Sequence, residues 1–344
     1  MQRLVSKGAA MKTKILQALR QNQETYVSGQ ELCEKFGVSR TAVWKAIKQL
    51  KEAGYEITAV QNRGYQLVAV PDILSQSEIA SRLRTKWLGH NVRYLEEVDS
   101  TNAEAKRIAE SAGSTDWHGT VVVADKQTAG RGRRGRTWSS PCGTGLFFSI
   151  LIKPEIDPGN ASMLTLVKGM ATAKGIAEVT GMQPQIKWPN DVVLNGKKIV
   201  GILTEMSAQI DYVNHIVVGT GINVRQSEFP QEIAKTATSL KLEMLQQGRE
   251  EQITRAQLLG AVLAHFERYY EIFLKTQDLS ALMEEYNGML ANCGRSVRVL
   301  DPLGEYEGTA LGIDDRGELL VEREGGISKV SSGEVSVRGI YGYI

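Results

Sequence analysis

Cysteine and histidine are both scarce in this sequence of 344 residues. The three cysteines are an odd number and lie far apart, at Cys33, Cys142 and Cys293. This pattern argues against a disulfide-stapled secreted domain and favours a reducing, cytoplasmic compartment. The four histidines lack the spacing of metal ligands, so we expect no metal site built from protein side chains.

Long apolar runs are also lacking. No uninterrupted apolar segment is long enough to span a bilayer, and the N-terminus has no signal-peptide pattern. The hydrophobic content of 42% is nevertheless sufficient for ordinary cores, and the length predicts two or three domains. We therefore expect a soluble, cytoplasmic, multidomain protein that does not bind a membrane.

Charge is distributed unevenly along the chain. Residues 1–70 contain 11 Lys and Arg against 5 Asp and Glu, a net charge of +6, whereas the whole chain carries only +2. The remainder is therefore slightly acidic. This asymmetry predicts a polyanionic partner for the N-terminal part.

The sequence KQTAGRGRRGRTW, residues 126–138, is the most unusual stretch of the chain. It alternates arginine with glycine and contains no acidic residue. Such a segment cannot bury an apolar face, and its glycines make a fixed empty conformation entropically costly. We therefore expect a mobile loop that binds an anion, and we call it the arginine loop.

Three interpretations of the arginine loop compete. Gly130, Gly132 and Gly135 match the dinucleotide fingerprint, but that motif must open a helix, and a proline with two more glycines follows within ten residues. An arginine-rich nucleic-acid site remains open. So does a loop that folds over a phosphate-bearing small molecule, because guanidinium groups bind phosphate and carboxylate oxygens in bidentate fashion.

The N-terminal region has the spacing of a helix-turn-helix. Three amphipathic helices are predicted after Met11, with Ser28 and Glu31 forming a capping box on the second and Ser39 capping the third. Two short alternating strands, residues 55–60 and 65–68, then flank a turn that contains Arg63. A basic hairpin after a recognition helix predicts a winged helix that binds DNA. The expected DNA contacts are Arg40, Thr41, Trp44, Lys45, Lys48 and Arg63.

The remainder of the chain alternates strands and helices. Polar residues 100–102 precede a helix, where they either cap it or hold a polar heterocycle. Strands at 119–124 and 145–152 anchor the arginine loop, and Asn195 and Gly196 join strands predicted at 186–194 and 198–205. This order favours an α+β or α/β core with a mixed or largely antiparallel sheet. After residue 292, five short strands predict a small β-barrel of SH3-like size.

Five motifs occur together in one order: DSTN, GRGRRGRTW, KWPND, KKIVGIL and GTGIN. With the winged helix before them, they make residues 11–344 resemble the bacterial family of bifunctional biotin–protein ligases and biotin-operon repressors. The resemblance implies a ligase core related to class II aminoacyl-tRNA synthetases. It also implies three domains: a DNA-binding domain at 11–70, a catalytic domain at 71–291 and an SH3-like domain at 292–344. Residues 1–10 lie outside the resemblance and lack hydrophobic periodicity, so we expect them to be an extension before Met11.

The resemblance further implies a two-step reaction. Biotin and MgATP form biotinyl-5′-AMP, and the biotinyl group then passes to a lysine of biotin carboxyl carrier protein. The biotin contacts implied are Ser100, Thr101, Asn102, Gln127, Arg131, Gly132, Arg133 and Lys187. The implied nucleotide contacts are Arg133, Arg136, Trp138 and Asn223, and the implied catalytic residues are Lys187, Arg133 and Arg131.

A carboxylate that attacks a phosphate brings two anions together, so the reaction requires cations rather than a protein nucleophile. Lys187 and Arg133 are the residue types that the chemistry needs. We expect biotinyl-5′-AMP to promote a homodimer that places two winged helices on a two-part operator. Two alternatives stay open: a ligand-sensing repressor without ligase activity, and an RNA-modifying enzyme.

Overall fold

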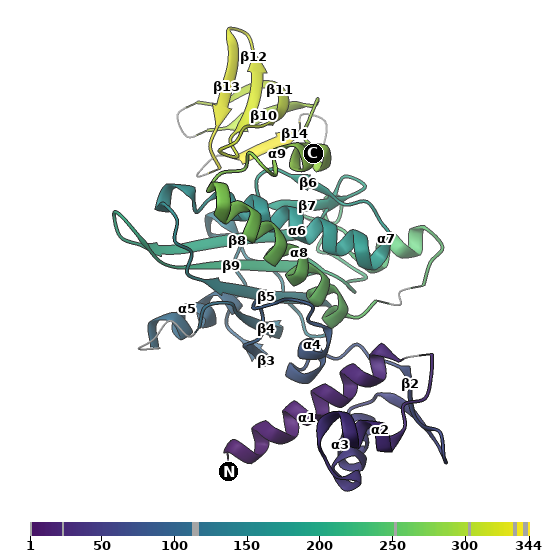
Figure 1. The fold of residues 1–344 in the computed structure, drawn as a ribbon. Helices are drawn as coiled ribbons and strands as arrows, with labels where there is room; N and C mark the ends of the chain where they lie inside the picture. Colours follow the sequence, from purple (N-terminus) through teal and green to yellow (C-terminus); the bar gives the residue numbers. More distant parts are fainter. Residues whose placement is uncertain are drawn as a thin grey trace. The chain divides into compact units, whose positions relative to one another are not determined.

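The computed structural model describes residues 2–22, 24–111, 117–250, 253–301, 304–332, 336–339 and 343–344. The chain divides into two compact units (Figure 1). The first comprises Met1–Leu83 and Ile253–Gly260, and the second comprises Arg84–Gln252 and Ala261–Ile344.

The first unit is a helical domain with a two-stranded wing. Its elements are α1 (Gln2–Gln21), α2 (Gly29–Phe36), α3 (Arg40–Glu52), β1 (Glu56–Val60), β2 (Gly64–Ala69) and α4 (Gln76–Arg82). Helix α1 begins before Met11, where the sequence had predicted its start. Ser28 and Ser39 cap α2 and α3 as predicted, because their hydroxyls accept from Glu31 N and Ala42 N at 3.0 and 3.3 Å.

The wing is fixed to the helices by a close backbone approach. Val27 and Tyr65 exchange backbone hydrogen bonds of 2.8 and 2.9 Å. Gly64, with φ +111°, leaves no room for a side chain, because a Cβ there would lie 2.1 Å from Val27 O. The hairpin predicted from the sequence is therefore present, and its turn is anchored to the segment before α2.

A buried carboxylate attaches α4 to the winged helix. Glu78 is fully buried and accepts hydrogen bonds from Arg20 at 2.8 and 3.0 Å and from Arg82 at 3.0 Å. Tyr55 OH donates to its second oxygen at 2.5 Å. Because the charge is fully paired and hydrogen-bonded, its burial is tolerated, and the network fixes α4 against α1 and the end of α3.

The second unit begins with a mixed sheet. Its strands are β3 (Val92–Val98), β4 (Thr120–Gln127), β5 (Gly145–Ile152), β6 (Gln185–Lys187), β7 (Asp191–Leu194), β8 (Lys197–Ala208) and β9 (Val213–Asn223). Among the described residues these form one seven-stranded sheet in the order β3-β4-β5-β9-β8-β7-β6. Only the β3–β4 pair in that sheet is parallel, which confirms the prediction of a mixed, largely antiparallel sheet.

Helices cover both faces of this sheet (Figure 1). Helix α5 (Thr101–Ser111) packs on β4, β5 and β9, and α6 (Met163–Thr180) packs on β6 to β9. The later helices are α7 (Leu240–Gln246), α8 (Arg255–Thr276) and α9 (Met283–Met289). Strand β5 shows the two faces, because successive side chains of a strand point to opposite sides. Phe148 meets Lys168 of α6, whereas Ser149 meets Thr101 at the start of α5. The site described below lies on the α5 side.

The prediction of a single strand at residues 186–194 is wrong. The chain reverses at residues 188–190, so that β6 and β7 pair antiparallel to each other, with Lys187 opposite Asp191. Trp188 at the reversal is held by distant partners: its backbone N–H donates to Asn292 Oδ1 at 2.9 Å and its Nε1 donates to Gly317 O at 3.0 Å.

The C-terminal strands are β10 (Ser296–Leu300), β11 (Tyr306–Ile313), β12 (Leu319–Arg323), β13 (Gly326–Val330) and β14 (Ser336–Gly339). In the described part of this region they form a five-stranded antiparallel sheet in the order β13-β12-β11-β10-β14. This agrees with the small all-β domain predicted from the sequence. Over the described ranges, no helix is long and apolar enough to cross a membrane.

Candidate functional site

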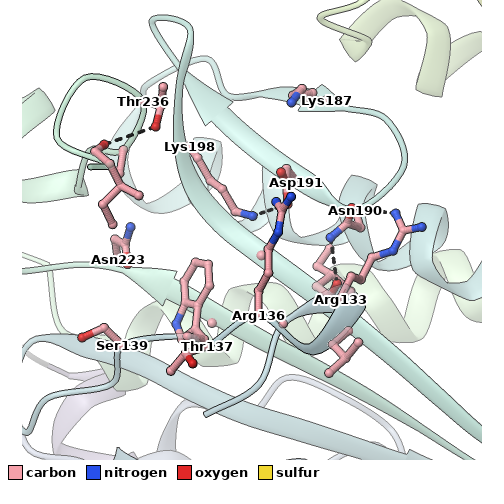
Figure 2. A pocket seen from close by; sticks show the side chains of 18 of the residues that line it. Arg133, Arg136, Thr137, Ser139, Lys187, Asn190, Asp191, Lys198, Asn223 and Thr236 are labelled. Atoms are coloured by element: carbon pink, nitrogen blue, oxygen red, sulfur yellow. Dashed lines mark hydrogen bonds and ion pairs between the residues drawn. The ribbon is translucent and has the colours of Figure 1, made fainter. Parts of the chain in front are cut away.

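A cavity of about 840 Å³ opens in the second unit (Figure 2). Its walls come from the start of α5, the arginine loop, β6 to β9 and the C-terminal residues. The sequence-predicted ligand contacts all line it: Ser100, Thr101, Asn102, Gln127, Arg131, Gly132, Arg133, Arg136, Trp138, Lys187 and Asn223. Residues separated by more than 120 positions in the chain therefore meet around one space.

One end of the cavity is a buried network of amides and hydroxyls. Gln127 Oε1 accepts from the backbone N–H of Thr101 at 2.9 Å and from its hydroxyl at 3.2 Å. Ser149 Oγ lies 2.7 Å from Thr101 Oγ1 and 2.6 Å from Asn102 Oδ1. These bonds fix the side chains in place before any ligand arrives.

Asn102 is held from two further directions. Its Nδ2 donates to Glu205 Oε2 at 2.7 Å and to Leu203 O at 3.2 Å. Lys106 pairs with the other oxygen of Glu205 at 2.6 Å. A Cβ on Gly219 would lie only 2.0 Å from Asn102 Oδ1, so the side chain can occupy this position only above a glycine.

The arginine loop runs over the cavity as a closed turn. Arg131 and Thr137 form an isolated antiparallel bridge, and Gly132 N donates to Arg136 O at 2.7 Å. Arg133 is half-buried and donates to Asn190 Oδ1 at 3.1 Å (Figure 2). It also donates to Ser332 O at 2.8 Å. Burial lowers the pKa of Arg133 from its ordinary value, but a guanidinium starts so high that it stays charged.

Lys187 and Asp191 face each other across the β6–β7 reversal. Lys187 is 6% exposed, and burial lowers its pKa to about 8, against the opposing effect of Asp191. Asp191 pairs with Lys198 at 2.6 Å and accepts a hydrogen bond from Tyr343 OH. The two lysines and the arginine loop together make this end of the cavity cationic.

The indole of Trp138 packs against the backbone of two glycines, Gly201 and Gly221, in the same cavity. A Cβ on Gly201 would lie 2.7 Å from the indole Cζ3, and a Cβ on Gly221 would lie 2.5 Å from Nε1. Lys198 Nζ lies over the Trp138 ring, 5.4 Å from its centroid. Asn223, the last residue of β9, also lines the cavity, and its Nδ2 donates to Thr238 O at 3.1 Å.

The predicted DNA contacts lie in the first unit and are exposed. Arg40, Thr41, Trp44, Lys45 and Lys48 lie on the outer side of α3, and Arg63 lies at the tip of the wing. Trp44 is 57% exposed, with Lys48 Nζ at 5.5 Å from its ring centroid. A large exposed aromatic beside cations suits a surface that meets base edges and phosphates.

Several residues of the site had not been assigned from the sequence. Ser149 and Glu205 support the polar end, and Asp191, Lys198 and Tyr343 surround Lys187. Asp191 lies in the KWPND motif and carried a sequence signal. Lys198 lies in the KKIVGIL motif and carried one as well. Ser149, Glu205 and Tyr343 lie in strands or near the C-terminus, outside the five motifs, and gave none.

Within the described ranges, no group of three or more His, Cys, Asp or Glu side chains is arranged to hold a metal ion. The residues that line the cavity make it a site with hydrogen-bonding amides and hydroxyls at one end and lysine and arginine side chains at the other. It suits a ligand that is a polar heterocycle at one end and an anion at the other.

Comparison with known families agrees with this geometry. Residues 94–223 match the biotin/lipoate A/B protein ligase family. Residues 12–66 match a helix-turn-helix domain, and residues 293–338 match the biotin protein ligase C-terminal domain. A protein ligase that carries its own DNA-binding domain is the class of protein that this fold and site define.

The similarity to two bacterial relatives extends over 96% and 90% of the chain. The chain is 39% identical to the bifunctional ligase/repressor BirA of Bacillus subtilis, over 96% of this chain and 99% of the relative. It is 31% identical to the protein of the same name from Escherichia coli, over 90% and 92%. The biotin protein ligase of Aquifex aeolicus, solved with biotin and ATP, superimposes with a TM-score of 0.61 at 34% identity, covering 73% of this chain and 99% of that one.

The chain belongs to the family of bifunctional biotin–protein ligase/repressors. It combines a biotin–protein ligase with a DNA-binding repressor domain.

Proposed function

We propose that the cavity activates biotin with ATP and transfers it to a lysine of a carrier protein. The observation that carries the proposal is the joining of a buried amide and hydroxyl network to a cationic end within one space of about 840 Å³. Ser100, Thr101, Asn102 and Gln127 bind the ureido ring, whose C=O and N–H groups need both donors and acceptors. A lipoyl dithiolane offers neither, so this end of the cavity favours biotin.

In the first step the biotin carboxylate attacks the α-phosphorus of ATP. A P–O bond forms to the carboxylate, the bond to the β-phosphate breaks, and pyrophosphate leaves with its electrons. Lys187, Arg133 and Arg131 offset the negative charge that develops as the two anions meet. Gly132 lets the arginine loop approach the carboxylate closely, because it carries no side chain.

The nucleotide lies toward Trp138, Arg136 and Asn223. Trp138 packs against adenine, and Arg136 and Asn223 contact the phosphates. Mg²⁺ enters with ATP as part of the substrate and neutralises the triphosphate, consistent with a cation that is held chiefly by phosphate oxygens and water. The arginine loop protects the mixed anhydride from hydrolysis by excluding water.

In the second step the amine of the carrier lysine attacks the acyl carbon. An amide bond forms, AMP leaves, and the amine loses a proton. The acceptor that we propose is the biotin carboxyl carrier protein of acetyl-CoA carboxylase, because relatives such as that of Paracoccus denitrificans are named as ligases for this enzyme.

We propose the following division of labour along the chain. Residues 11–70 bind operator DNA through Arg40, Thr41, Trp44, Lys45, Lys48 and Arg63. Residues 71–291 catalyse ligation, and 292–344 complete the C-terminal domain, with 1–10 as an extension. Biotinyl-5′-AMP acts as corepressor by promoting a homodimer in the cytoplasm, since one chain offers a single recognition helix and a two-part operator needs two.

A labelling assay tests the proposed reaction. The protein is incubated with biotin, MgATP and a biotin carrier domain, and protein-bound biotin is detected by blotting. We expect label on the carrier only when all three are present, and none when the acceptor lysine is replaced by arginine. Biotin-dependent DNA binding without any label would instead identify a ligand-sensing repressor, and label on RNA would identify an RNA-modifying enzyme.

A further inference from the structure

Tyr343 belongs to the C-terminal region, yet its side chain lines the cavity. The centroid of its ring lies 3.6 Å from Lys187 Nζ. Its hydroxyl donates a hydrogen bond to Asp191 Oδ2. One aromatic side chain therefore holds both charged residues of the β6–β7 reversal.

The ring replaces part of the hydration that Lys187 loses on burial. The ammonium is almost entirely removed from water, and the electron-rich face of an aromatic ring attracts a cation at this distance. Lysine has a flexible four-carbon stem, so its head group needs such a partner to stay in one place.

The hydroxyl acts on the neighbouring carboxylate. Asp191 Oδ1 pairs with Lys198 at 2.6 Å, and Oδ2 accepts from Tyr343. Each oxygen of Asp191 is thus engaged by a partner other than Lys187. The Lys187 ammonium lies against the face of the Tyr343 ring. An anionic substrate can draw the ammonium away from a ring more easily than it could draw it out of an ion pair with a carboxylate.

The C-terminal region also contacts a second proposed catalytic residue, Arg133. Ser332 O accepts a hydrogen bond of 2.8 Å from Arg133 of the arginine loop. The C-terminal region therefore contacts two cations of the cavity, one through a ring and one through a backbone carbonyl.

We propose that Tyr343 is a positioning residue for adenylate formation: its ring holds the Lys187 ammonium toward the cavity while its hydroxyl and Lys198 engage Asp191. This inference rests on the role proposed above for Lys187. Tyr343 acts through Lys187 and not on the substrate itself.

Two substitutions separate the ring from the hydroxyl. Tyr343→Phe keeps the ring and removes the hydrogen bond to Asp191, whereas Tyr343→Leu keeps an apolar side chain and removes the ring. Biotin-dependent ATP–pyrophosphate exchange measures adenylate formation. We expect Tyr343→Leu to lower kcat/KM for biotin about 10-fold, the scale of a desolvated cation–ring contact, and Tyr343→Phe to lower it less than about 3-fold.

The pH profile supplies a readout that a purely structural role would not move. Burial lowers the pKa of Lys187 to about 8, with Asp191 raising it and Lys198, Arg338 and Arg136 lowering it. Burial raises the pKa of Tyr343 far above this range, so Tyr343 stays protonated. Because kcat/KM follows the free enzyme, it falls as pH rises through the Lys187 pKa. We expect this falling limb to shift to lower pH in Tyr343→Leu and to stay in place in Tyr343→Phe.

Lys187→Met serves as the reference variant. If Lys187→Met is inactive while Tyr343→Leu has the wild-type kcat/KM and pH limb, the inference about Tyr343 is wrong and the role of Lys187 stands. If Lys187→Met exchanges at the wild-type rate, the proposed role of Lys187 itself is wrong. Equal losses in both Tyr343 variants, with lowered thermal stability and an unmoved pH limb, would assign Tyr343 a structural role and overturn the inference.

Discussion

The indole of Trp138 lies directly against the backbone of Gly201, where a Cβ would come within 2.7 Å of Cζ3. Real Cβ atoms essentially never make contacts this short, so any side chain at position 201 must displace the ring. Gly201 has no positive φ, and therefore its lack of a side chain, rather than its backbone freedom, is what the site uses.

Gly201→Ala should weaken nucleotide use. The added methyl group moves Trp138, which we propose packs against adenine, and a misplacement of about 1 Å can cost up to about 100-fold in rate. We expect KM for ATP to rise about 10-fold in pyrophosphate exchange. Gly288→Ala in α9 is the control, because nothing lies within 4 Å of its Cβ position. An unchanged KM for ATP in Gly201→Ala would remove Trp138 from the nucleotide site.

Lys168→Met should stabilise the protein. Lys168 is fully buried in α6, and no hydrogen-bond partner of its Nζ is found in the described part of the chain. The rings of Phe148 and Phe266 lie at 4.3 and 5.1 Å. Two ring contacts contribute roughly 0.5–2 kcal/mol each, less than the several kcal/mol that burying an ammonium costs. We expect a gain on the order of 2 kcal/mol in the free energy of unfolding at pH 7.

The sign of the pH dependence follows from the same burial. Burial lowers the pKa of Lys168 well below its ordinary value, so the unfolded chain binds the extra proton between the two pKa values. Wild-type stability therefore rises with pH toward about 10.4, the pKa of an unfolded lysine, and the advantage of Lys168→Met shrinks over that range. Lys174→Met, a half-exposed site on the same helix, should change stability by less than about 1 kcal/mol. A pH-independent difference between Lys168→Met and wild type would contradict this account.

Replacing Arg40 and Lys45 with alanine should weaken DNA binding without affecting ligation. Both side chains are exposed on α3, in the unit that does not contain the cavity. If each neutralises one phosphate, the slope of log affinity against log salt should fall by about 2. Parallel loss of ligase activity, or normal operator binding, would count against the proposed division of labour.

Biotinyl-5′-AMP should strengthen dimerisation of the protein and should order the arginine loop. Ordering the loop with ligand removes an entropic cost from association, a coupling of about 1–3 kcal/mol that linkage makes reciprocal. Sedimentation with and without biotin and MgATP measures the dimer, and proteolysis at residues 131–136 measures the loop. An unchanged monomer–dimer equilibrium, with operator affinity indifferent to adenylate, would leave a ligase without a biotin switch.

Local sequence patterns predicted those parts of the fold that are stabilised locally. Ser28 and Ser39 cap helices through bonds to residues three positions away, and the wing follows from its turn residues. The residues carried over from the family motifs also line one cavity. The motifs lie at the ends of strands and at the start of α5, and these positions meet when the sheet forms.

The features that were missed depend on distant partners. The reversal at Trp188 is held by Asn292 and Gly317, which belong to the C-terminal region. Ser149 gives no signal in an apolar strand, although it supports Asn102 across the sheet surface. Tyr343 meets Lys187 only once the second unit has folded, and no pattern near either residue indicates the pairing.

The most direct test of the account is biotin-dependent ATP–pyrophosphate exchange by Lys187→Ala. Loss of the cation at the developing negative charge should reduce the rate by about 100-fold or more, while thermal unfolding remains close to that of wild type. Exchange at the wild-type rate in a folded Lys187→Ala protein would contradict the claim that this cavity forms biotinyl-5′-AMP with Lys187 at its centre.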